Sequence, residues 1–304
     1  MVIPETALAI KVDVDTDRGT RIGVPNLLAL FRELGVSATF LFSLGPDNTG
    51  RAIKRVFRPG FFTKVARTNV VAMYGIRTLL NGVLLPGPHI GRRNDTVMRA
   101  ARAQGHEVGI HCYDHIRWQD GLGRMRATEV TEEFGKARDE FLRIFGEPAA
   151  TAGAAGWQAN AYSLAAYDDA GLRYASDTRG THPFMPRVGN RVFRTLQIPT
   201  TLPTLDELLG RPGYDESQIL ELYLSRLRTG GLHVLTAHAE IEGMSKLPLF
   251  HELLVRVLDL PARLHRLCDI ADELLRMLPN VPVCELAQGQ VDGRSGTLAV
   301  QRCA

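Results

Sequence analysis

The stretch "LAIKVDVDTDRG", residues 8–19, joins an apolar run to three acids at every second position. Residues 7–14 alternate as a β-strand does, so Asp13, Asp15 and Asp17 point to the same face. Carboxylates this close raise one another's pKa unless a cation or a basic group lies among them. The stretch therefore predicts a strand that ends either in a solvated acidic patch or in a site that holds positive charge.

Two kinds of site with this spacing of acids can be compared with the sequence. A calcium loop of the D-x-D-x-D-G type starting at Asp13 is excluded, because it would need glycine in place of Arg18 and glutamate in place of Val24. A D-x-D phosphatase would use Asp13 as its nucleophile and Asp15 as its acid. This alternative fits the strand but gives no role to histidines, and it stays open at this point.

The composition is that of an ordinary soluble globular protein, with 304 residues of which 45% are hydrophobic and 23% charged. Four cysteines form no C-x-x-C pair: Cys112, Cys268, Cys284 and Cys303. The N-terminus has neither a basic start nor an apolar export segment. We therefore expect free thiols in the reducing cytoplasm.

Strand-like and helix-like segments alternate along most of the chain. Apolar, β-rich runs occupy residues 7–14, 37–42, 106–111, 149–153, 172–176, 191–198, 232–237 and 281–284. Helical patterns occupy residues 25–35, 95–104, 127–145, 159–170, 216–229 and 262–278. Repeated β-then-α order predicts an α/β fold with a parallel sheet, and about eight such units favour a (β/α) barrel.

A basic insertion, residues 51–93, interrupts this order after the second strand. It carries nine basic residues and no acid: Arg51, Lys54, Arg55, Arg58, Lys64, Arg67, Arg77, Arg92 and Arg93. Its aliphatic side chains fit an amphipathic element on an anionic membrane, or a helical hairpin that caps the barrel, better than a nucleic-acid site. We expect one domain over residues 1–286, including this insertion, and a flexible tail over residues 287–304.

Histidines complete the charge pattern. In "GHEVGIHCYDH", His111 and His115 are four residues apart, a spacing that would place both imidazoles on one helical turn as ligands of one divalent metal. His238 follows the predicted strand at residues 232–237. Because the carboxyl ends of barrel strands share one face, we expect these histidines and the D-x-D acids to meet there.

Several stretches together resemble one known family. They are "KVDVDTDRGTRIGVPNLL", "FSLGPDNTGR", "GIHCYDHIRWQ", "AAGWQAN", "SDTRG", "QIPTTLPTLDE" and "HAEIEG". Their order is similar to that of the NodB-type polysaccharide deacetylases, carbohydrate esterase family 4, which have a distorted (β/α) barrel. The match looks closer to a deformylase branch of that family, which acts on a polyprenyl-phosphate-linked formamido-arabinose in the lipid A modification that gives polymyxin resistance.

The resemblance implies roles for particular residues. Asp13 would be the catalytic base and His238 the acid for the leaving amine, while Asp177 of "SDTRG" would orient His238. One divalent metal, zinc or else cobalt, manganese, nickel or iron, would polarise the formyl group. Its ligands would be Asp15, His111 and His115.

The sequence departs from the broader family pattern at "TAGAAGWQAN", where the family has an R-x-P motif whose arginine pairs with the base. The partner of Asp13 is thus open, with Arg179 and Arg18 as candidates. Trp157 in the same stretch either lines the sugar site or belongs to the core. The departure favours the deformylase branch over an N-acetyl-sugar or polysaccharide deacetylase. A non-catalytic lipid-binding protein is a further alternative, but it gives no reason for the three histidines.

The implied substrate has a polyprenyl tail and a phosphate, so the protein has to reach a membrane surface. We expect peripheral attachment to the cytoplasmic face of the inner membrane, through cations that bind anionic headgroups and the lipid phosphate. The candidate membrane and substrate contacts are Arg51, Lys54, Arg55, Arg58, Lys64, Arg67, Trp157 and Arg179. We expect no nucleic-acid partner.

Overall fold

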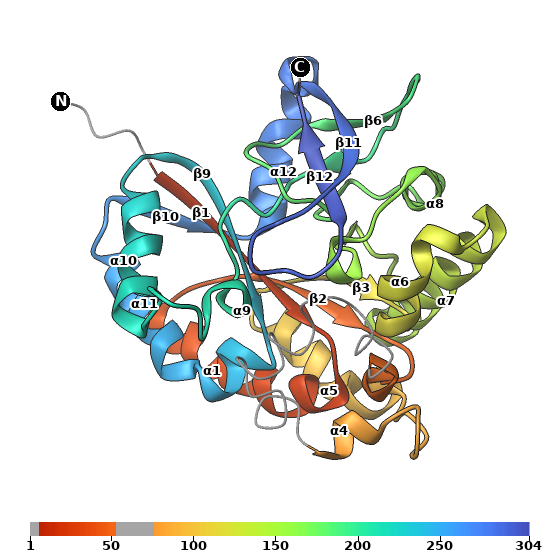
Figure 1. Ribbon diagram of the computed structural model, residues 1–304, viewed down its shortest axis with the longest axis horizontal. Helices are drawn as coiled ribbons and strands as arrows, with labels where there is room; N and C mark the ends of the chain where they lie inside the picture. The colour runs from red at the N-terminus through yellow and green to blue at the C-terminus, as the bar shows by residue number, and fades with distance from the viewer. Residues whose placement is uncertain (1–5, 53–75, 304) are drawn as a thin grey trace.

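The computed structural model describes residues 6–52 and 76–303, and a parallel sheet lies at its centre (Figure 1). Strand β1 pairs with β9 along its whole length, and its other edge pairs first with β10 and then with β2. From β2 the sheet continues through β3, β4, β5 and β8. These strands are β1 (Thr6–Val14), β2 (Thr39–Ser43), β3 (Glu107–Cys112), β4 (Thr151–Ala152), β5 (Tyr174–Ala175), β8 (Leu196–Gln197), β9 (Gly231–His238) and β10 (Ala262–His265).

The segment after β8 closes the sheet into a barrel. The backbone N–H groups of Thr201 and Leu202 donate to the carbonyl oxygen of Val234 in β9, at 3.2 and 3.1 Å. The circuit therefore runs from β9 through β1 and β8 back to β9, with β10 displaced to one side. This confirms the predicted distorted (β/α) barrel.

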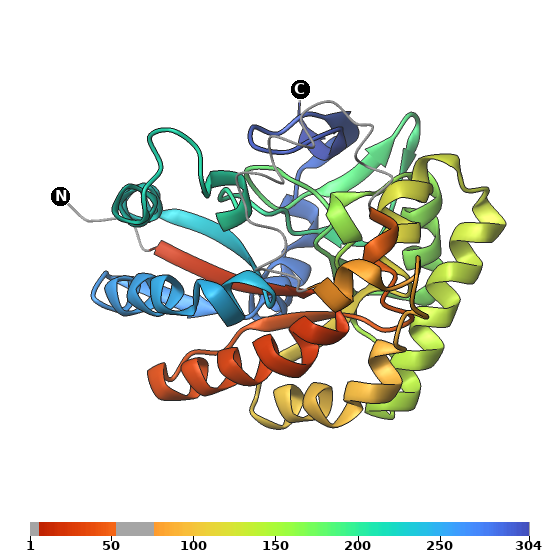
Figure 2. The ribbon, with the colours of Figure 1, turned by 60° about the horizontal axis from the view of Figure 1, so that its bottom comes forward.

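Helices surround the barrel and bury their apolar faces against it. Neighbouring helices contact each other in the order α10, α11, α1, α5, α7, α8. Figure 2 shows α11, α1 and α5 side by side along one side of the sheet. The helices are α1 (Val24–Leu34), α5 (Ile90–Ala103), α7 (Ala127–Phe145), α8 (Ala161–Ala170), α10 (Glu216–Leu227), α11 (Leu247–Leu258) and α12 (Leu267–Arg276). Within the described residues, no helix is both long and apolar enough to cross a bilayer.

Local signals account for helix α1. Pro25 stands in its first turn, where the missing N–H of proline costs no hydrogen bond. Gly35 ends it at φ 67°, a left-handed conformation that glycine adopts without strain. Between them Phe31 packs against Phe40 of β2 and Phe250 of α11, with ring centres 6.0 and 6.1 Å apart.

Shorter elements lie at the ends of the strands and beside the barrel. They are α4 (Ile76–Leu80), α6 (His115–Gly121) and α9 (Leu205–Leu208), with the single turns η1 (Gly19–Gly23), η3 (Leu122–Arg124), η4 (Ala155–Trp157), η5 (Ile241–Ser245) and η6 (Leu278–Asn280). A second sheet has the order β12, β11, β6, β7, formed by β6 (Met185–Val188), β7 (Arg191–Val192), β11 (Val283–Gly289) and β12 (Leu298–Arg302).

The C-terminal residues differ from the prediction of a flexible tail. Strands β11 and β12 form an antiparallel pair, from Glu285 opposite Arg302 to Gly289 opposite Leu298. Next to this pair Cys284 and Cys303 form a disulfide, so the prediction of four free thiols was wrong, and Cys112 and Cys268 are the free cysteines. The polar, glycine-containing sequence suits the connection of a hairpin as well as it suits a tail.

Three other segments differ from the sequence expectations. The helix predicted over residues 262–278 begins as strand β10, and the strand predicted over 191–198 is divided into β7 and β8. Helix α11 was not predicted. In the predicted insertion 51–93, residues 53–75 lie outside the described residues, and its last four residues belong to α5.

Candidate active site

The two residues predicted as base and acid stand side by side at the ends of neighbouring strands. Asp13 of β1 is opposite His238 of β9 in the parallel register, and the N–H of Ala239 donates to the carbonyl oxygen of Asp13 at 3.0 Å. Both line one pocket together with the predicted metal ligands. The pocket is lined by Asp13, Asp15, His111, His115, Gln119, Gly156, Trp157, Asp206, His238, Ile241 and Arg294.

Three of these side chains fit a divalent metal. Asp15 Oδ1 lies 3.3 Å from His111 Nε2 and 3.4 Å from His115 Nε2. Ligand atoms of a tetrahedral zinc ion with ordinary bond lengths lie about 3.4 Å apart. Asp15 Oδ1 is buried and has no hydrogen-bond partner among the described residues, as expected of an atom placed to bind a cation. The donor set of one carboxylate and two imidazoles therefore forms a candidate metal site.

The charges around these groups favour a cation at this position. Burial alone would raise the pKa of Asp15, but His115 and His111 hold that pKa well below its usual range. Burial acts to lower the pKa of His111, while Asp13 and Asp15 raise it above its ordinary value. The negative charge of the strand end is thus matched by the imidazoles.

The two histidines reach this position in a way that the sequence did not predict. His111 belongs to strand β3, whereas His115 is the first residue of helix α6, so they do not share a helical turn. Asp114 begins the helix by accepting a hydrogen bond from the N–H of Arg117 at 2.9 Å, and Asn48 donates to the same carboxylate at 2.6 Å. The strand end and the helix start together bring the ring centres to 5.3 Å.

Lys11 is the partner of Asp13 that the sequence left open. Its side chain is 0% exposed, with Nζ 3.4 Å from Asp13 Oδ2, and it donates to the carbonyl oxygen of Ser176 at 3.1 Å. Burial lowers the pKa of Lys11, and the carboxylates of Asp13 and Asp177 oppose this. The sequence held a signal for this pair, because residues two apart in a strand share a face.

Arg179, the first candidate partner of Asp13, is engaged elsewhere. Its guanidinium pairs with Glu207 and donates to the carbonyl oxygen of Leu202 at 2.9 Å. It lies 5.3 Å from the ring of Trp157. Arg179 therefore supports the floor of the pocket rather than the base.

Asp177 does not contact His238 as the resemblance implied. Its carboxylate accepts hydrogen bonds from the N–H of Ala154 at 2.6 Å and from Gln197 Nε2 at 2.9 Å. Burial raises the pKa of Asp177 to about 6. His238 Nδ1 is buried without a hydrogen-bond partner among the described residues. Asp177 thus lies behind the site, next to Lys11.

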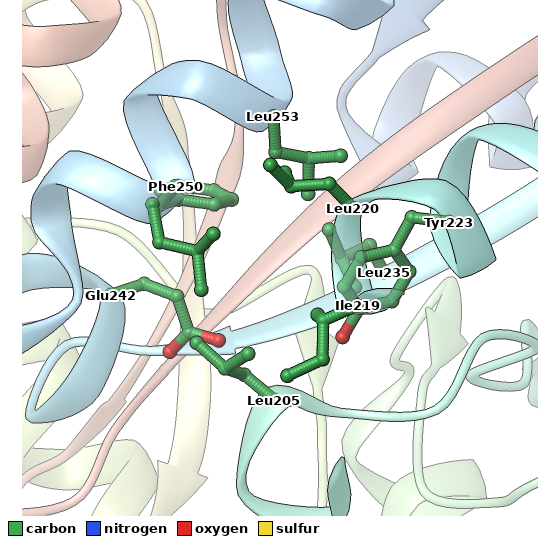
Figure 3. Close-up of a pocket in the computed structure, with 9 residues that line it drawn as sticks. Leu205, Ile219, Leu220, Tyr223, Leu235, Glu242, Phe250 and Leu253 are labelled. Atoms are coloured by element: carbon green, nitrogen blue, oxygen red, sulfur yellow. The ribbon is translucent and has the colours of Figure 1, made fainter. Parts of the chain in front are cut away.

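Two buried glutamates of "HAEIEG" hold the strand ends instead. Glu242 accepts the backbone N–H of His238 at 2.8 Å, and Glu240 accepts the backbone N–H of Asp15 at 3.1 Å. Figure 3 shows Glu242 among apolar side chains that include Leu205, and this burial raises its pKa to about 8. Burial, and then the charge of Asp15, raises the pKa of Glu240 well above its ordinary value. No local feature of the sequence marks these two glutamates as part of the site.

Trp157 lines the pocket and is also buried in the core, and its contact with a sugar stays a prediction. Its φ is 53°, a rare conformation for a bulky residue, and its Nε1 donates to Thr200 Oγ1 at 3.1 Å. The guanidinium of Arg294 lies 4.2 Å from its ring centre and pairs with Glu207 at 2.7 Å and with Asp206 at 3.3 Å. Arg294 comes from the connection between β11 and β12, which the sequence analysis had assigned to the tail.

The predicted membrane contacts are largely untested by the structure. Arg51 is exposed, and its Nε donates to the carbonyl oxygen of Gly82 at 3.0 Å. The other predicted contacts of this segment lie outside the described residues: Lys54, Arg55, Arg58, Lys64 and Arg67. Their role stays a prediction.

Comparison with known proteins agrees with this arrangement. A family model described as "Polysaccharide deacetylase" matches residues 11–175, a span that contains Asp13, both metal-site histidines and Lys11. The chain belongs to the polysaccharide deacetylase family. A solved structure of a "probable Polysaccharide deacetylase from Pseudomonas aeruginosa PAO1" has the same fold, with a TM-score of 0.61, 16% identity, and coverage of 90% of this chain and 92% of that one.

Within the polysaccharide deacetylase family, two relatives match nearly the whole chain. A protein of Shewanella sediminis (strain HAW-EB3), named "Probable 4-deoxy-4-formamido-L-arabinose-phosphoundecaprenol deformylase ArnD", is 36% identical over 97% of this chain and 95% of its own length. A protein of Wigglesworthia glossinidia brevipalpis with the same name is 31% identical over 93% of this chain and 98% of its own.

Proposed function

We propose that this protein hydrolyses the formamide of 4-deoxy-4-formamido-L-arabinose phosphoundecaprenol, releasing formate and the amino-sugar lipid used to modify lipid A. We infer the substrate from the similarity over 97% of the chain to a relative that is named for this deformylation. The site supports the reaction class, because Asp13 and His238 flank a candidate metal site in one pocket. The phosphatase alternative leaves the two histidines of that site without a role.

The chain's own residues account for both proton transfers. Asp13, paired with Lys11, accepts a proton from the attacking water as the water oxygen bonds to the formyl carbon. His238 gives a proton to the nitrogen as the C–N bond breaks, so formate and an amine leave. A divalent ion held by Asp15, His111 and His115 would act as a Lewis acid on the amide carbonyl. We propose zinc for this ion, although cobalt, nickel, manganese and iron accept the same donors.

The reaction is tested with the formamido-sugar lipid and metal-loaded protein, followed by mass analysis. We expect loss of the formyl group with the wild-type protein, and intact substrate with His238→Ala and Asp13→Asn or with excess chelator. The matching acetamido-sugar lipid, assayed in parallel, distinguishes a deformylase from the second candidate, an N-acetyl-sugar deacetylase. A formamide that persists with the wild-type protein would exclude the proposal.

We also propose that the catalytic face lies against an anionic membrane on the cytoplasmic side. Besides the basic residues of the insertion, three consecutive apolar side chains support this: Val83, Leu84 and Leu85 are 52%, 74% and 39% exposed. The turn that carries them is connected to the site. Gly82 packs against Asn48, and Asn48 donates to Asp114, the N-cap of helix α6, which begins with His115. Exposed aliphatic groups beside cations are typical of an interfacial contact.

Membrane binding is tested by sedimentation with vesicles of phosphatidylglycerol and phosphatidylethanolamine. We expect Leu84→Glu, and separately glutamate at Arg51, Lys54, Arg55 and Arg58, to release the protein while the bound metal stays unchanged. Leu142→Glu on α7 is the matched control, because Leu142 is also exposed, at 49%, but lies on another helix. Equal binding by wild type, Leu84→Glu and the charge variant would exclude the proposed surface.

A further inference from the structure

A second group of metal-binding side chains lies at the base of the C-terminal hairpin. His182 Nε2 is 3.6 Å from Cys303 Sγ and 4.0 Å from Cys284 Sγ. Cys284 lies in β11 and Cys303 directly follows β12, so both are next to the last residues paired between these strands, and their Cα atoms are 4.6 Å apart. None of the three residues lines the pocket of the candidate active site.

The spacing of these atoms is that of ligands around one ion. In a tetrahedral zinc site with ordinary bond lengths, an imidazole nitrogen and a thiolate lie about 3.6 Å apart, and two thiolates about 3.8 Å apart. The distance from His182 to Cys303 equals the first value, and the distance from His182 to Cys284 is 0.4 Å longer. The larger change is the separation of the two sulfurs that are joined in the disulfide, and rotation of the exposed Cys303 side chain can provide this movement.

Neighbouring polar groups orient the ligands as they do in metal sites. Thr181 Oγ1 lies 2.9 Å from His182 Nδ1, which leaves Nε2 directed at the sulfurs. Gln301 donates to the carbonyl oxygen of His182 at 2.9 Å and to Cys284 Sγ at 3.7 Å. A partner on the second ring nitrogen and an N–H donor to a sulfur are the supports that commonly fix such ligands.

We propose that Cys284 and Cys303, once reduced, bind a soft divalent ion such as zinc together with His182, at a second metal site. A dithiol reductant supplies the two electrons and two protons that open the disulfide and is itself oxidised to a disulfide. The ion then displaces the two thiol protons and is held by two thiolates and one imidazole, with water in the fourth position. In both states a cross-link at its base holds the hairpin that carries Arg294 to the active-site pocket.

The test is a cobalt titration of the full-length protein after reduction and anaerobic removal of the reductant. We expect a thiolate-to-cobalt charge-transfer band in the near ultraviolet and a second equivalent of bound cobalt. The catalytic site cannot give this band, because its ligands contain no sulfur. The oxidised protein should bind only the first equivalent and show no such band.

Variants assign the band to particular residues. Cys303→Ser and the double variant Cys284→Ser, Cys303→Ser should abolish it, and His182→Ala should weaken cobalt binding about tenfold or more. Cys268→Ser is the matched control, because Cys268 is the partly exposed free thiol and should leave the band unchanged. The proposal is overturned if the reduced wild type shows no band, or if the band persists in the double variant.

Discussion

At the scale of single residues, a fully buried lysine balances the charge of the predicted base. Lys11 Nζ lies 3.4 Å from Asp13 Oδ2, where the broader family pattern has an arginine from another motif. A lysine two positions away in the same strand can reach the carboxylate because both side chains leave the same face. Lys11 therefore stands beside Asp13 where the resemblance implies an arginine, and this part of the site depends on a local sequence relation.

Lys11→Met should therefore affect both stability and catalysis. Removing one partner of a buried ion pair leaves the other charge without compensation, so we expect the free energy of unfolding in urea to fall by about 3–5 kcal/mol. The value of kcat should fall about 100-fold or more with little change in KM, because the role proposed for Asp13 is proton transfer. The double variant Lys11→Met, Asp13→Asn should regain part of the stability but no activity, and Lys11→Arg should retain part of both. Equal unfolding free energies of wild type and Lys11→Met would contradict a stabilising ion pair between Lys11 and Asp13.

At the scale of elements, His106, directly before β3, links this strand to neighbouring segments of the chain. It makes its hydrogen bond there only when Nδ1 carries no proton. It is 5% exposed, and its Nδ1 accepts the N–H of Ala38 at 3.1 Å, which only a ring without a proton at Nδ1 can do. Its ring packs against Phe31 and Phe40. Burial, and then the nearby charge of Arg266, lowers the pKa of His106 to about 4.

This shift predicts a loss of stability in acid. Because the folded pKa is about 4 and that of an unfolded histidine about 6.5, the unfolded chain binds the extra proton between these values. The stabilisation is complete above pH 6.5 and is lost as pH falls toward 4, by up to about 3 kcal/mol. His106→Gln keeps an acceptor but does not titrate, so its unfolding free energy should fall less steeply over this range. His251→Gln, on an exposed histidine, should follow the wild type, and identical slopes for His106→Gln and wild type would refute the prediction.

Elements with local sequence signals were predictable, whereas elements such as the C-terminal hairpin, which depend on contacts with distant residues, were not. Helix α7 was predicted to the residue, 127–145, because its amphipathic spacing and its terminal Gly146 are local signals. Strand β10 was taken for the start of a helix, since four residues carry little periodicity and become a strand only beside β1. Likewise Arg294 pairs with Glu207, 87 residues away, and nothing near either residue marks that contact.

Arg294→Ala tests the contribution of the hairpin to the pocket. Its side chain is 12% exposed and pairs with the carboxylates of Glu207 and Asp206, so we expect a loss of about 3 kcal/mol in unfolding free energy. Arg191→Ala is the matched control, because Arg191 also lies over an aromatic ring, that of Phe193, but is exposed. Its loss should stay within about 1 kcal/mol. If the segment with Arg294 were a flexible tail, neither substitution would lower the free energy of unfolding by more than about 1 kcal/mol.

At the scale of the whole molecule, the position of residues at strand ends predicted which side chains meet in the pocket, but it did not predict the buried groups that contact them. Asp13, His111 and His238 lie in the last two residues of their strands and Asp15 directly follows β1, so the β/α order alone brings them to one edge of the sheet. Other contacts depend on the finished packing: Glu242 in η5 accepts the backbone N–H of His238, and Glu240, directly before η5, accepts that of Asp15. The same packing placed Asp177 away from His238.

The candidate metal site joins parts of the chain that are far apart, so metal should stabilise the whole fold. Asp15 follows β1, and His111 is the last residue but one of β3, with β2 between these strands. At a metal concentration about 100 times the dissociation constant, binding to the folded state alone adds about 2.7 kcal/mol, or about 4 °C in Tm for a chain of this size. We expect this rise in calorimetry of zinc-loaded against chelator-treated protein, in the Cys284→Ser, Cys303→Ser background that isolates the first site. Asp13→Asn should keep the rise although it is inactive, whereas His111→Ala should lose it, and a rise that survives His111→Ala would place the metal elsewhere.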